Sequence, residues 1–204
     1  KALKAGATTI LCSKKDLNKI IKKKANILTT KNVRLSVSLI IKKMFPKQPK
    51  NIVAITGTNG KTSIAFYLKS IWKAANISSA TIGTLGMIYA NKKVPINLTT
   101  PDPITLHKYI DNLKKKGVKN IALEASSHGI DQNRIDALSI NRAVFSNFSR
   151  DHLDYHKTFE NYFKAKKRLF SEILAIQGIA IVNNDCKYGK KIEHFCKRKK
   201  IKVF

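Results

Sequence analysis

Along residues 46–204, short apolar runs alternate with longer stretches in which apolar residues recur at helical spacing. The short runs predict strands at 52–56, 79–84, 120–124, 143–148, 179–183 and 201–204. Between them the spacing predicts helices at 61–75, 104–116, 159–174 and 188–197, and a hairpin or extended loop at 86–100. Such alternation is typical of α/β proteins whose mostly parallel sheet is flanked by helices.

The first 45 residues follow a shorter pattern of the same kind. Runs at 7–12 and 27–30 predict strands, and Asn32 is a suitable N-cap for a helix that extends to Met44. The apolar face expected of that helix consists of Val33, Val37, Ile40, Ile41 and Met44. Two prolines in 45–49 then break it. We therefore expect 1–45 to be the end of a smaller α/β domain and 46–204 to belong to a second domain.

The strand predicted at 52–56 leads into a glycine-rich turn, Gly57-Thr58-Asn59-Gly60-Lys61-Thr62. Gly57 and Gly60 can adopt backbone angles closed to other residues, so that successive N–H groups can converge on phosphate oxygens. Lys61 can reach the terminal phosphates, and the Thr62 hydroxyl can ligate the accompanying Mg²⁺. Ile55 stands where the longer, common phosphate-loop pattern has its first glycine. The strand before the turn and the helix after it therefore carry the prediction of a nucleotide site.

The composition of the chain argues against nucleic-acid binding and against a membrane protein. The net charge is +28, but only six of the 40 basic residues are Arg, the side chain best suited to base and phosphate recognition. We therefore expect no nucleic-acid partner, and a basic phosphate-loop ATPase acting on nucleic acid is the alternative from another class. No apolar run approaches the ~20 residues that span a bilayer. Three unevenly spaced cysteines fit a reducing compartment, and we expect a cytoplasmic monomer without membrane contact.

Polar residues gather directly after the predicted strands, where open α/β sheets bind their ligands. Glu124 ends one strand, and His152 lies in the polar segment that follows the next. A single histidine in such a loop is more often a hydrogen-bonded loop residue than a ligand. A carboxylate and an imidazole on neighbouring strand ends nevertheless suit a divalent cation beside the terminal phosphate, and the joint placement favours a metal site.

Four motifs, in this order, closely resemble those of the Mur ligase family. They are Gly57-Thr58-Asn59-Gly60-Lys61-Thr62, Thr99-Thr100-Pro101-Asp102-Pro103, Glu124-Ala125-Ser126-Ser127-His128-Gly129 and Asp151-His152-Leu153-Asp154-Tyr155-His156. The last two are most similar to members that add the third amino acid of the peptidoglycan precursor. The resemblance covers the whole chain and implies the end of an N-terminal uridine-nucleotide domain, 1–45, and most of a central ATPase domain, 46–204. The family's C-terminal domain is expected to be absent.

The resemblance implies an ATP-dependent ligase that works through an acyl phosphate. ATP would phosphorylate the D-glutamate carboxylate of UDP-N-acetylmuramoyl-L-alanyl-D-glutamate. The amine of meso-diaminopimelate or L-lysine would then displace phosphate to form an amide. Another Mur-type ligase or a folylpolyglutamate-type ligase is the alternative within the same fold.

The resemblance also implies roles for individual residues. Residues Gly57 to Thr62 would hold the triphosphate, and Lys61, His152 and a carbamylated Lys166 would be catalytic. Thr62, Glu124, His152 and the Lys166 carbamate would bind Mg²⁺. The muramoyl substrate would contact Thr99, Thr100, Ser126, Gln132 and Arg134. Two positions depart from the family pattern: Leu98 replaces a frequent Asn before the Thr pair, and Cys186 replaces a usual acidic residue beside Asp185.

Overall fold

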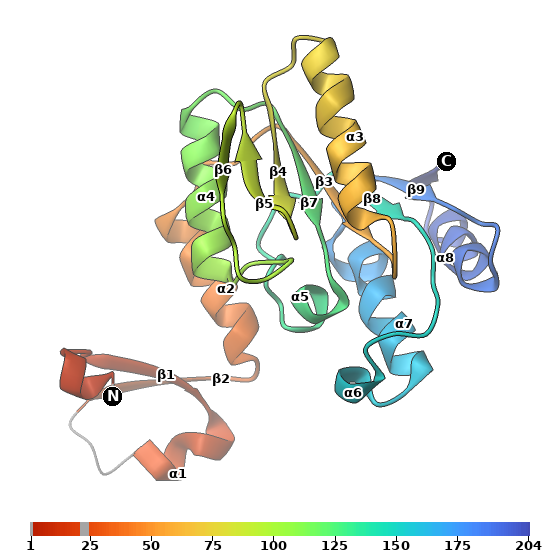
Figure 1. Ribbon diagram of the computed structural model, residues 1–204. Helices are drawn as coiled ribbons and strands as arrows, with labels where there is room; N and C mark the ends of the chain where they lie inside the picture. The colour runs from red at the N-terminus through yellow and green to blue at the C-terminus, as the bar shows by residue number, and fades with distance from the viewer. Residues whose placement is uncertain (1, 21–24) are drawn as a thin grey trace.

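An eight-stranded sheet organises residues 51–204 in the computed structural model, which describes residues 2–20 and 25–204 (Figure 1). The strand order is β10-β9-β8-β3-β7-β4-β5-β6. Neighbouring strands run parallel from β10 to β4, whereas β5 and β6 are added antiparallel at one edge. The mostly parallel α/β sheet predicted from the sequence is therefore confirmed. Its strands are β3 (Asn51–Thr56), β4 (Ser79–Gly83), β5 (Gly86–Tyr89), β6 (Lys92–Val94), β7 (Asn120–Glu124), β8 (Arg142–Phe145), β9 (Ile179–Val182) and β10 (Lys202–Val203).

Helices cover both faces of this sheet. α3 (Lys61–Ala74) lies on one face, and α4 (Pro103–Lys115) lies on the other (Figure 1). The face of α4 also receives α7 (Phe159–Arg168) and α8 (Lys187–Arg198), whose apolar side chains join the same core. Two short helices, α5 (Ser127–Asp131) and α6 (Leu153–His156), lie in the loops after β7 and β8. The sequence pattern did not predict either short helix.

The central strand β3 shows why the sheet is buried on both sides. Ile52 and Ala54 belong to the core beneath α4, α7 and α8, while Val53 and Ile55 belong to the smaller core beneath α3. Because a parallel strand covered on both faces needs apolar residues at every position, β3 reads as a continuous apolar run. The carboxyl end of this rigid strand is where the glycine-rich turn begins.

The N-terminal part has a sheet of its own. β1 (Thr9–Ser13) and β2 (Asn26–Thr30) pair in parallel, and they lie apart from the main sheet (Figure 1). A short helix, α1 (Leu17–Ile20), lies between them in sequence. α2 (Val33–Met44) connects this sheet to the rest of the chain, and the predicted N-cap is confirmed because the Asn32 side chain accepts a hydrogen bond from the N–H of Leu35. The domain boundary at 45–46 stays a prediction.

Three local expectations were wrong. On α2, Ile40 and Met44 are 48% and 64% exposed, whereas Ser38 and Ile41 are buried, because Ser38 donates to the carbonyl of Asn133 and turns that side inward. β8 ends at Phe145 rather than at residue 148, because the following residues bond to the glycine-rich turn. The helix predicted to reach residue 174 ends at Arg168 and continues as a π-helical turn, Leu169–Ile173. Within the described residues, no helix combines the length and the apolar character that a bilayer span requires.

Candidate functional site

The glycine-rich turn after β3 has the backbone geometry that a phosphate-binding loop requires. Gly57 has φ +152°, and a Cβ there would lie 1.9 Å from Ser146 Oγ and 3.1 Å from the backbone N of Asn147. Gly60, with φ +82°, stands at the N-cap of α3. Both positions therefore favour glycine for conformation, and Gly57 also for space. The start of α3 follows immediately, so that its free N–H groups face the turn.

Residues that follow β8 hold this turn in place. The side-chain oxygen of Asn147 accepts from the N–H of Asn59 at 2.9 Å, and the carbonyl of Asn147 accepts from the N–H of Thr58 at 3.1 Å. The Ser146 hydroxyl donates to the carbonyl of Asn59 at 2.6 Å. Sequence reasoning placed a polar cluster after this strand but did not assign Ser146 or Asn147 a role. The parallel pairing of β3 with β8 was the missing information, because it brings the two loops together.

Two lysines from distant parts of the chain converge on one carbonyl. Lys61 Nζ donates to the carbonyls of Gly57 and Thr58 at 3.0 and 2.8 Å, and Lys166 Nζ, from α7, donates to the same Gly57 carbonyl at 2.7 Å. Lys166 is 1% exposed. Its burial, together with the charge of Lys61 and against the opposing effect of Asp151, lowers its pKa to about 7. At neutral pH a large fraction of Lys166 is therefore an uncharged amine.

Burial also lowers the pKa of Lys61, but the carboxylates of Glu124 and Asp151 oppose this shift. A third group, the buried ring of Tyr162, lies against both the turn and Lys166. The Tyr162 hydroxyl is 3.2 Å from Thr58 Oγ1, and the ring centroid is 4.6 Å from Lys166 Nζ. Sequence reasoning missed Tyr162, because nothing in its spacing sets it apart from a core aromatic residue.

Glu124 forms the acidic side of the site. It is 2% exposed and accepts hydrogen bonds from the Thr62 hydroxyl at 2.9 Å, the Thr84 N–H at 3.0 Å and the Thr84 hydroxyl at 3.1 Å. Space for the carboxylate exists because residue 83 is glycine: a Cβ there would lie 2.1 Å from Glu124 Oε1. The three donors are neutral, and carboxylate and hydroxyl oxygens are ligands that Mg²⁺ prefers. The donor set around Glu124 therefore fits a magnesium ion.

His152 lies at the rim of this arrangement. Its side chain is 42% exposed, and Nε2 is 3.4 Å from Asp151 Oδ2. Its ring packs edge-on against the ring of His128, with centroids 4.9 Å apart. In the part of the chain that the structure describes, no three His, Cys, Asp or Glu side chains are grouped closely enough to bind a metal by themselves. A cation beside Glu124 would therefore need the Thr62 hydroxyl and further oxygen ligands.

Four of the five residues predicted to contact the muramoyl substrate form a hydrogen-bonded row next to Glu124, whereas the Thr99 hydroxyl is 3.1 Å from that of Thr84. The Thr100 hydroxyl donates to the carbonyl of Glu124 at 2.7 Å and accepts from the N–H of Ser126 at 2.9 Å. The Ser126 hydroxyl caps α5 by accepting from the N–H of Gly129 at 3.0 Å. Arg134 donates to the carbonyl of Thr100 at 2.6 Å and to the side-chain oxygen of Gln132 at 2.6 and 3.2 Å. Thr100 itself is fully buried.

A cavity of about 340 Å³ joins the two groups. Ten of the predicted site residues line it: Thr58, Asn59, Gly60, Lys61, Thr62, Thr99, Glu124, Ser126, His152 and Lys166. Gly57, Thr100, Gln132 and Arg134 do not line it. Gly57 and Thr100 each bond to a lining residue, Arg134 bonds to Thr100, and Gln132 bonds to Arg134. Asp185 and Cys186 lie at the start of α8, where the Cys186 thiol caps the helix, and neither lines the cavity.

The cavity also has lining residues that the sequence analysis did not select. Thr84 follows β4, and the same strand-end argument that selected Glu124 would have found it. Ser127 stands inside a motif already noted, and its hydroxyl is buried without a hydrogen-bond partner among the described residues. Such an uncommitted hydroxyl can bond to a ligand in the cavity.

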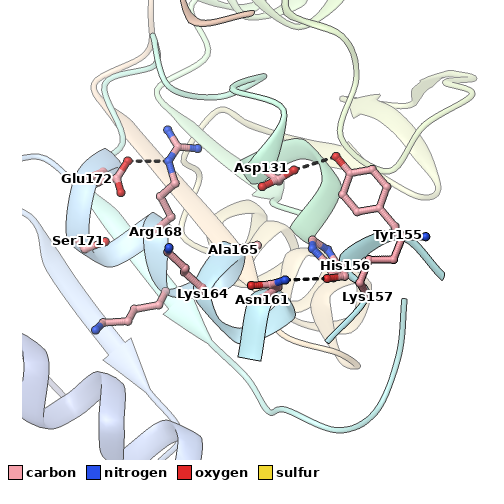
Figure 2. Close-up of a pocket in the computed structure, with 11 residues that line it drawn as sticks. Asp131, Tyr155, His156, Lys157, Asn161, Lys164, Ala165, Arg168, Ser171 and Glu172 are labelled. Carbon is pink, nitrogen blue, oxygen red and sulfur yellow. Dashed lines mark hydrogen bonds and ion pairs between the residues drawn. The ribbon is translucent and has the colours of Figure 1, made fainter. Parts of the chain in front are cut away.

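A second cavity of about 650 Å³ lies beside the first, along α7 and the adjoining ends of α5 and α6 (Figure 2). Asp131, Tyr155 and His156 line one side of it, and Lys164, Arg168 and Glu172 of α7 and the turn after it line the other. Its two carboxylates are engaged, Asp131 with the Tyr155 hydroxyl and Glu172 with Arg168. The residues predicted from the sequence do not line this cavity.

The sequence and the fold of this chain have counterparts in known proteins. The model of the Mur ligase middle domain matches residues 55–204. The chain belongs to the Mur ligase family. Among curated Mur ligases, the UDP-N-acetylmuramoyl-L-alanyl-D-glutamate–2,6-diaminopimelate ligase of Bradyrhizobium diazoefficiens is 43% identical over 162 residues, which are 79% of this chain and 33% of that protein. The protein of the same name from Rickettsia bellii is 38% identical over 208 residues, 98% of this chain and 42% of the relative.

Solved structures agree with this family. A structure of a UDP-N-acetylmuramoyl-L-alanyl-D-glutamate–2,6-diaminopimelate ligase aligns with a TM-score of 0.77 at 32% identity, covering 88% of this chain and 37% of that chain. E. coli FolC, solved with ADP, aligns with a TM-score of 0.64 at 15% identity and shares the fold. The chain spans about a third to two fifths of the length of these curated Mur ligases.

Proposed function

We propose that the complete protein containing this chain is the ATP-dependent ligase that adds meso-diaminopimelate to UDP-N-acetylmuramoyl-L-alanyl-D-glutamate. The names of the similar ligases favour diaminopimelate over L-lysine. The uridine nucleotide, the diamino acid and ATP are the proposed partners, and the cytoplasm is the proposed compartment. A Mur-type ligase with another substrate is the alternative, because the chain spans only 33% to 42% of the length of these relatives.

The observation that carries the proposal is the continuous set of contacts between the glycine-rich turn and the substrate row. Glu124 bonds through its carboxylate to Thr62 of the turn and through its carbonyl to Thr100 of the row. A triphosphate on the turn and a carboxylate substrate on the row would therefore face each other across one cavity. Transfer of a phosphoryl group needs this proximity more than any particular catalytic group.

In the proposed reaction, a carboxylate oxygen of D-glutamate attacks the terminal phosphorus of ATP, and the bond to the bridging oxygen breaks to release ADP. The amine of diaminopimelate then attacks the acyl carbon, phosphate leaves with the bonding electrons, and the nitrogen loses a proton to give the amide. Lys61 and the N–H groups of the turn would hold the phosphates in line. A Mg²⁺ ion held by Thr62 and Glu124, with His152 at the rim, would neutralise phosphate charge.

Lys166 is proposed to act after carbamylation. Its neutral amine would bond to the carbon of CO₂ and release one proton, which converts the buried neutral amine into a carboxylate-like carbamate anion. Burial and the lowered pKa support this step, because only an unprotonated amine reacts with CO₂. The resulting charge would suit a site that already holds Lys61 within contact of the same Gly57 carbonyl. His152 would then bind the cation together with the oxygen ligands from Thr62, Glu124 and the carbamate.

The deciding experiment is ATP-dependent phosphate release by the complete protein. UDP-N-acetylmuramoyl-L-alanyl-D-glutamate is supplied with meso-diaminopimelate or with L-lysine, in the wild type, in Lys166→Ala and in the matched control Lys164→Ala. Lys164 lies on the same helix but is exposed. We expect release that needs the dipeptide nucleotide and diaminopimelate, is reduced about 10³-fold in Lys166→Ala and is unchanged in Lys164→Ala.

Other outcomes discriminate among the alternatives. Phosphate release with L-lysine but not with diaminopimelate would mean that L-lysine is the amine substrate, and the proposed reaction type would still hold. Phosphate release without any muramoyl substrate would show that the site hydrolyses ATP, and it would contradict the proposed muramoyl substrate. Equal losses in both lysine variants would contradict the special role of Lys166.

A further inference from the structure

Tyr155, on α6, joins two polar residues of the α5 segment through one hydroxyl. Its hydroxyl donates to Asp131 Oδ2 at 2.8 Å and accepts from Gln132 Nε2 at 3.2 Å. The side chain points towards Asp131 at the wall of the larger cavity (Figure 2). Because its single proton is committed to the carboxylate, the lone pairs of the hydroxyl are the part that Gln132 meets.

The other side of Gln132 is committed to Arg134. Gln132 Oε1 accepts from Arg134 Nη2 at 2.6 Å and from Nε at 3.2 Å. The guanidinium group also donates from Nη1 to the carbonyl of Thr100 at 2.6 Å. An amide rotated by 180° would turn its NH2 group towards the N–H donors of Arg134 and its oxygen towards the Tyr155 oxygen, whose proton already bonds to Asp131. The carboxylate of Asp131 thus fixes, from one end, which group donates and which accepts in each hydrogen bond of the row.

We propose that Tyr155 is a positioning residue that orients Gln132 and, through it, the guanidinium of Arg134 towards the carboxylate-bearing muramoyl substrate. The inference deepens the proposed function and rests on it for the identity of the substrate. Tyr155 acts at a distance from the reacting atoms, because it contacts neither the glycine-rich turn nor the smaller cavity. Tyr155 would contribute by fixing the orientation of the Arg134 guanidinium, because the hydrogen bonds of this planar group depend on angle as well as on distance.

The contacts of the Tyr155 ring are distinct from those of its hydroxyl, so the two can be tested separately. The Tyr155 ring lies against the ring of His128, with centroids 4.2 Å apart, and against that of His156 at 4.8 Å. Tyr155→Phe therefore keeps these contacts and removes only the link between Asp131 and Gln132. Tyr89→Phe is the matched control, because Tyr89 lies on β5, next to the edge strand β6, and its hydroxyl makes one long bond, 3.4 Å to the carbonyl of Lys116.

The first test compares the KM values of the complete protein for its two nucleotide substrates. In Tyr155→Phe we expect KM for UDP-N-acetylmuramoyl-L-alanyl-D-glutamate to rise about fivefold, the effect of losing one hydrogen bond in an oriented row. KM for ATP and kcat should stay at wild-type values, and Tyr89→Phe should change none of them. An unchanged KM for the muramoyl substrate in Tyr155→Phe would overturn the proposal, as would an equal rise in the KM for ATP.

The second test asks whether Tyr155 works through Gln132. In a Gln132→Ala background, Tyr155→Phe should produce almost no further rise in KM, since the group that it orients is gone. Independent, multiplying effects of the two substitutions would contradict a positioning role.

The third test needs no substrate and separates the two proposals. Hydrogen exchange of the Arg134 Nε–H is followed by NMR in the wild type, Tyr155→Phe and Tyr89→Phe. We expect faster exchange only in Tyr155→Phe, because the acceptor Gln132 Oε1 loses its fixed orientation. Unchanged exchange would overturn the positioning role even in an active ligase. Faster exchange in a protein that ignores the muramoyl substrate would instead refute the proposed function alone.

Discussion

The two ends of the strand-end cavity are built from different interactions. At the nucleotide end, Lys61, Lys166 and Glu124 are buried or half-buried ionisable groups, and the two lysines bond to a single backbone carbonyl. At the substrate end, the guanidinium of Arg134 links Thr100 to Gln132 through fixed hydrogen bonds to neutral oxygen acceptors. The first end depends on charge and protonation, and the second depends on orientation. Substitutions at the two ends should therefore change different kinetic parameters.

The largest expected effect is at the nucleotide end, in Lys61→Met. Removal of the ammonium group that would contact the terminal phosphates should lower kcat of the complete protein by about 10³-fold, as the loss of a preorganised transition-state donor does. Affinity for the muramoyl dipeptide should stay near the wild-type value. Steady-state phosphate release, together with equilibrium binding of the dipeptide nucleotide, measures both.

Lys69→Met, on the same helix α3 but outside the smaller cavity, is the control and should leave both values unchanged. If Lys61→Met weakened binding of the muramoyl dipeptide as strongly as it lowered kcat, the two ends would not be separable in the way that their contacts indicate.

The same contrast explains what the sequence could predict. The nucleotide end begins with a local motif, Gly57 to Thr62, whose chemistry depends on neighbours in sequence, and the strand before it is a plain apolar run. This part and the parallel sheet were predictable from pattern and spacing. The anchors Asn147 and Tyr162 were not, because they reach the turn only through the pairing of β3 with β8 and the packing of α7.

The substrate end was predictable only by resemblance. Gln132 and Arg134 lie in a segment without clear periodicity, and the hydrogen bond of Arg134 to Thr100, which is 34 residues earlier in the chain, forms only in the fold. Lys166 is a similar case, since spacing alone could not distinguish it from the other lysines of the chain. Its burial, which follows from the way α7 packs on the core, is what separates it. The exposed Ile40 and Met44 of α2 show the opposite error, in which helical spacing suggested burial that the packing does not provide.

The next effect concerns stability at the nucleotide end. Lys166 has a pKa of about 7 in the folded protein, below its ordinary value of 10.5, so the unfolded chain binds more protons between these two values. The contribution of Lys166 to the free energy of unfolding should therefore rise with pH across this window and be flat below it. Between pH 7 and pH 9 the rise should be about 2 kcal/mol.

Urea unfolding of the complete protein in CO₂-depleted buffer with a chelator measures this rise, in the wild type and in Lys166→Met. The variant should lack it, while the exposed-lysine control Lys164→Met should retain it. Equal pH slopes in wild type and Lys166→Met would mean that Lys166 is not held in the buried, partly neutral state on which its proposed carbamylation depends.

The smallest effect is expected at the substrate end, in Arg134→Lys. The charge is kept, but the fork that bonds to both Gln132 and the Thr100 carbonyl is lost, because an ammonium group cannot reproduce its planar geometry. KM for the muramoyl dipeptide should rise about tenfold, the cost of an oriented charged contact, with kcat and KM for ATP unchanged. Tyr155→Phe added to Arg134→Lys should produce no additional rise, since there is no fork left to orient. A fall in kcat with unchanged KM would indicate that Arg134 acts at the reacting phosphoryl group. It would contradict the expectation that substitutions at the two ends change different kinetic parameters.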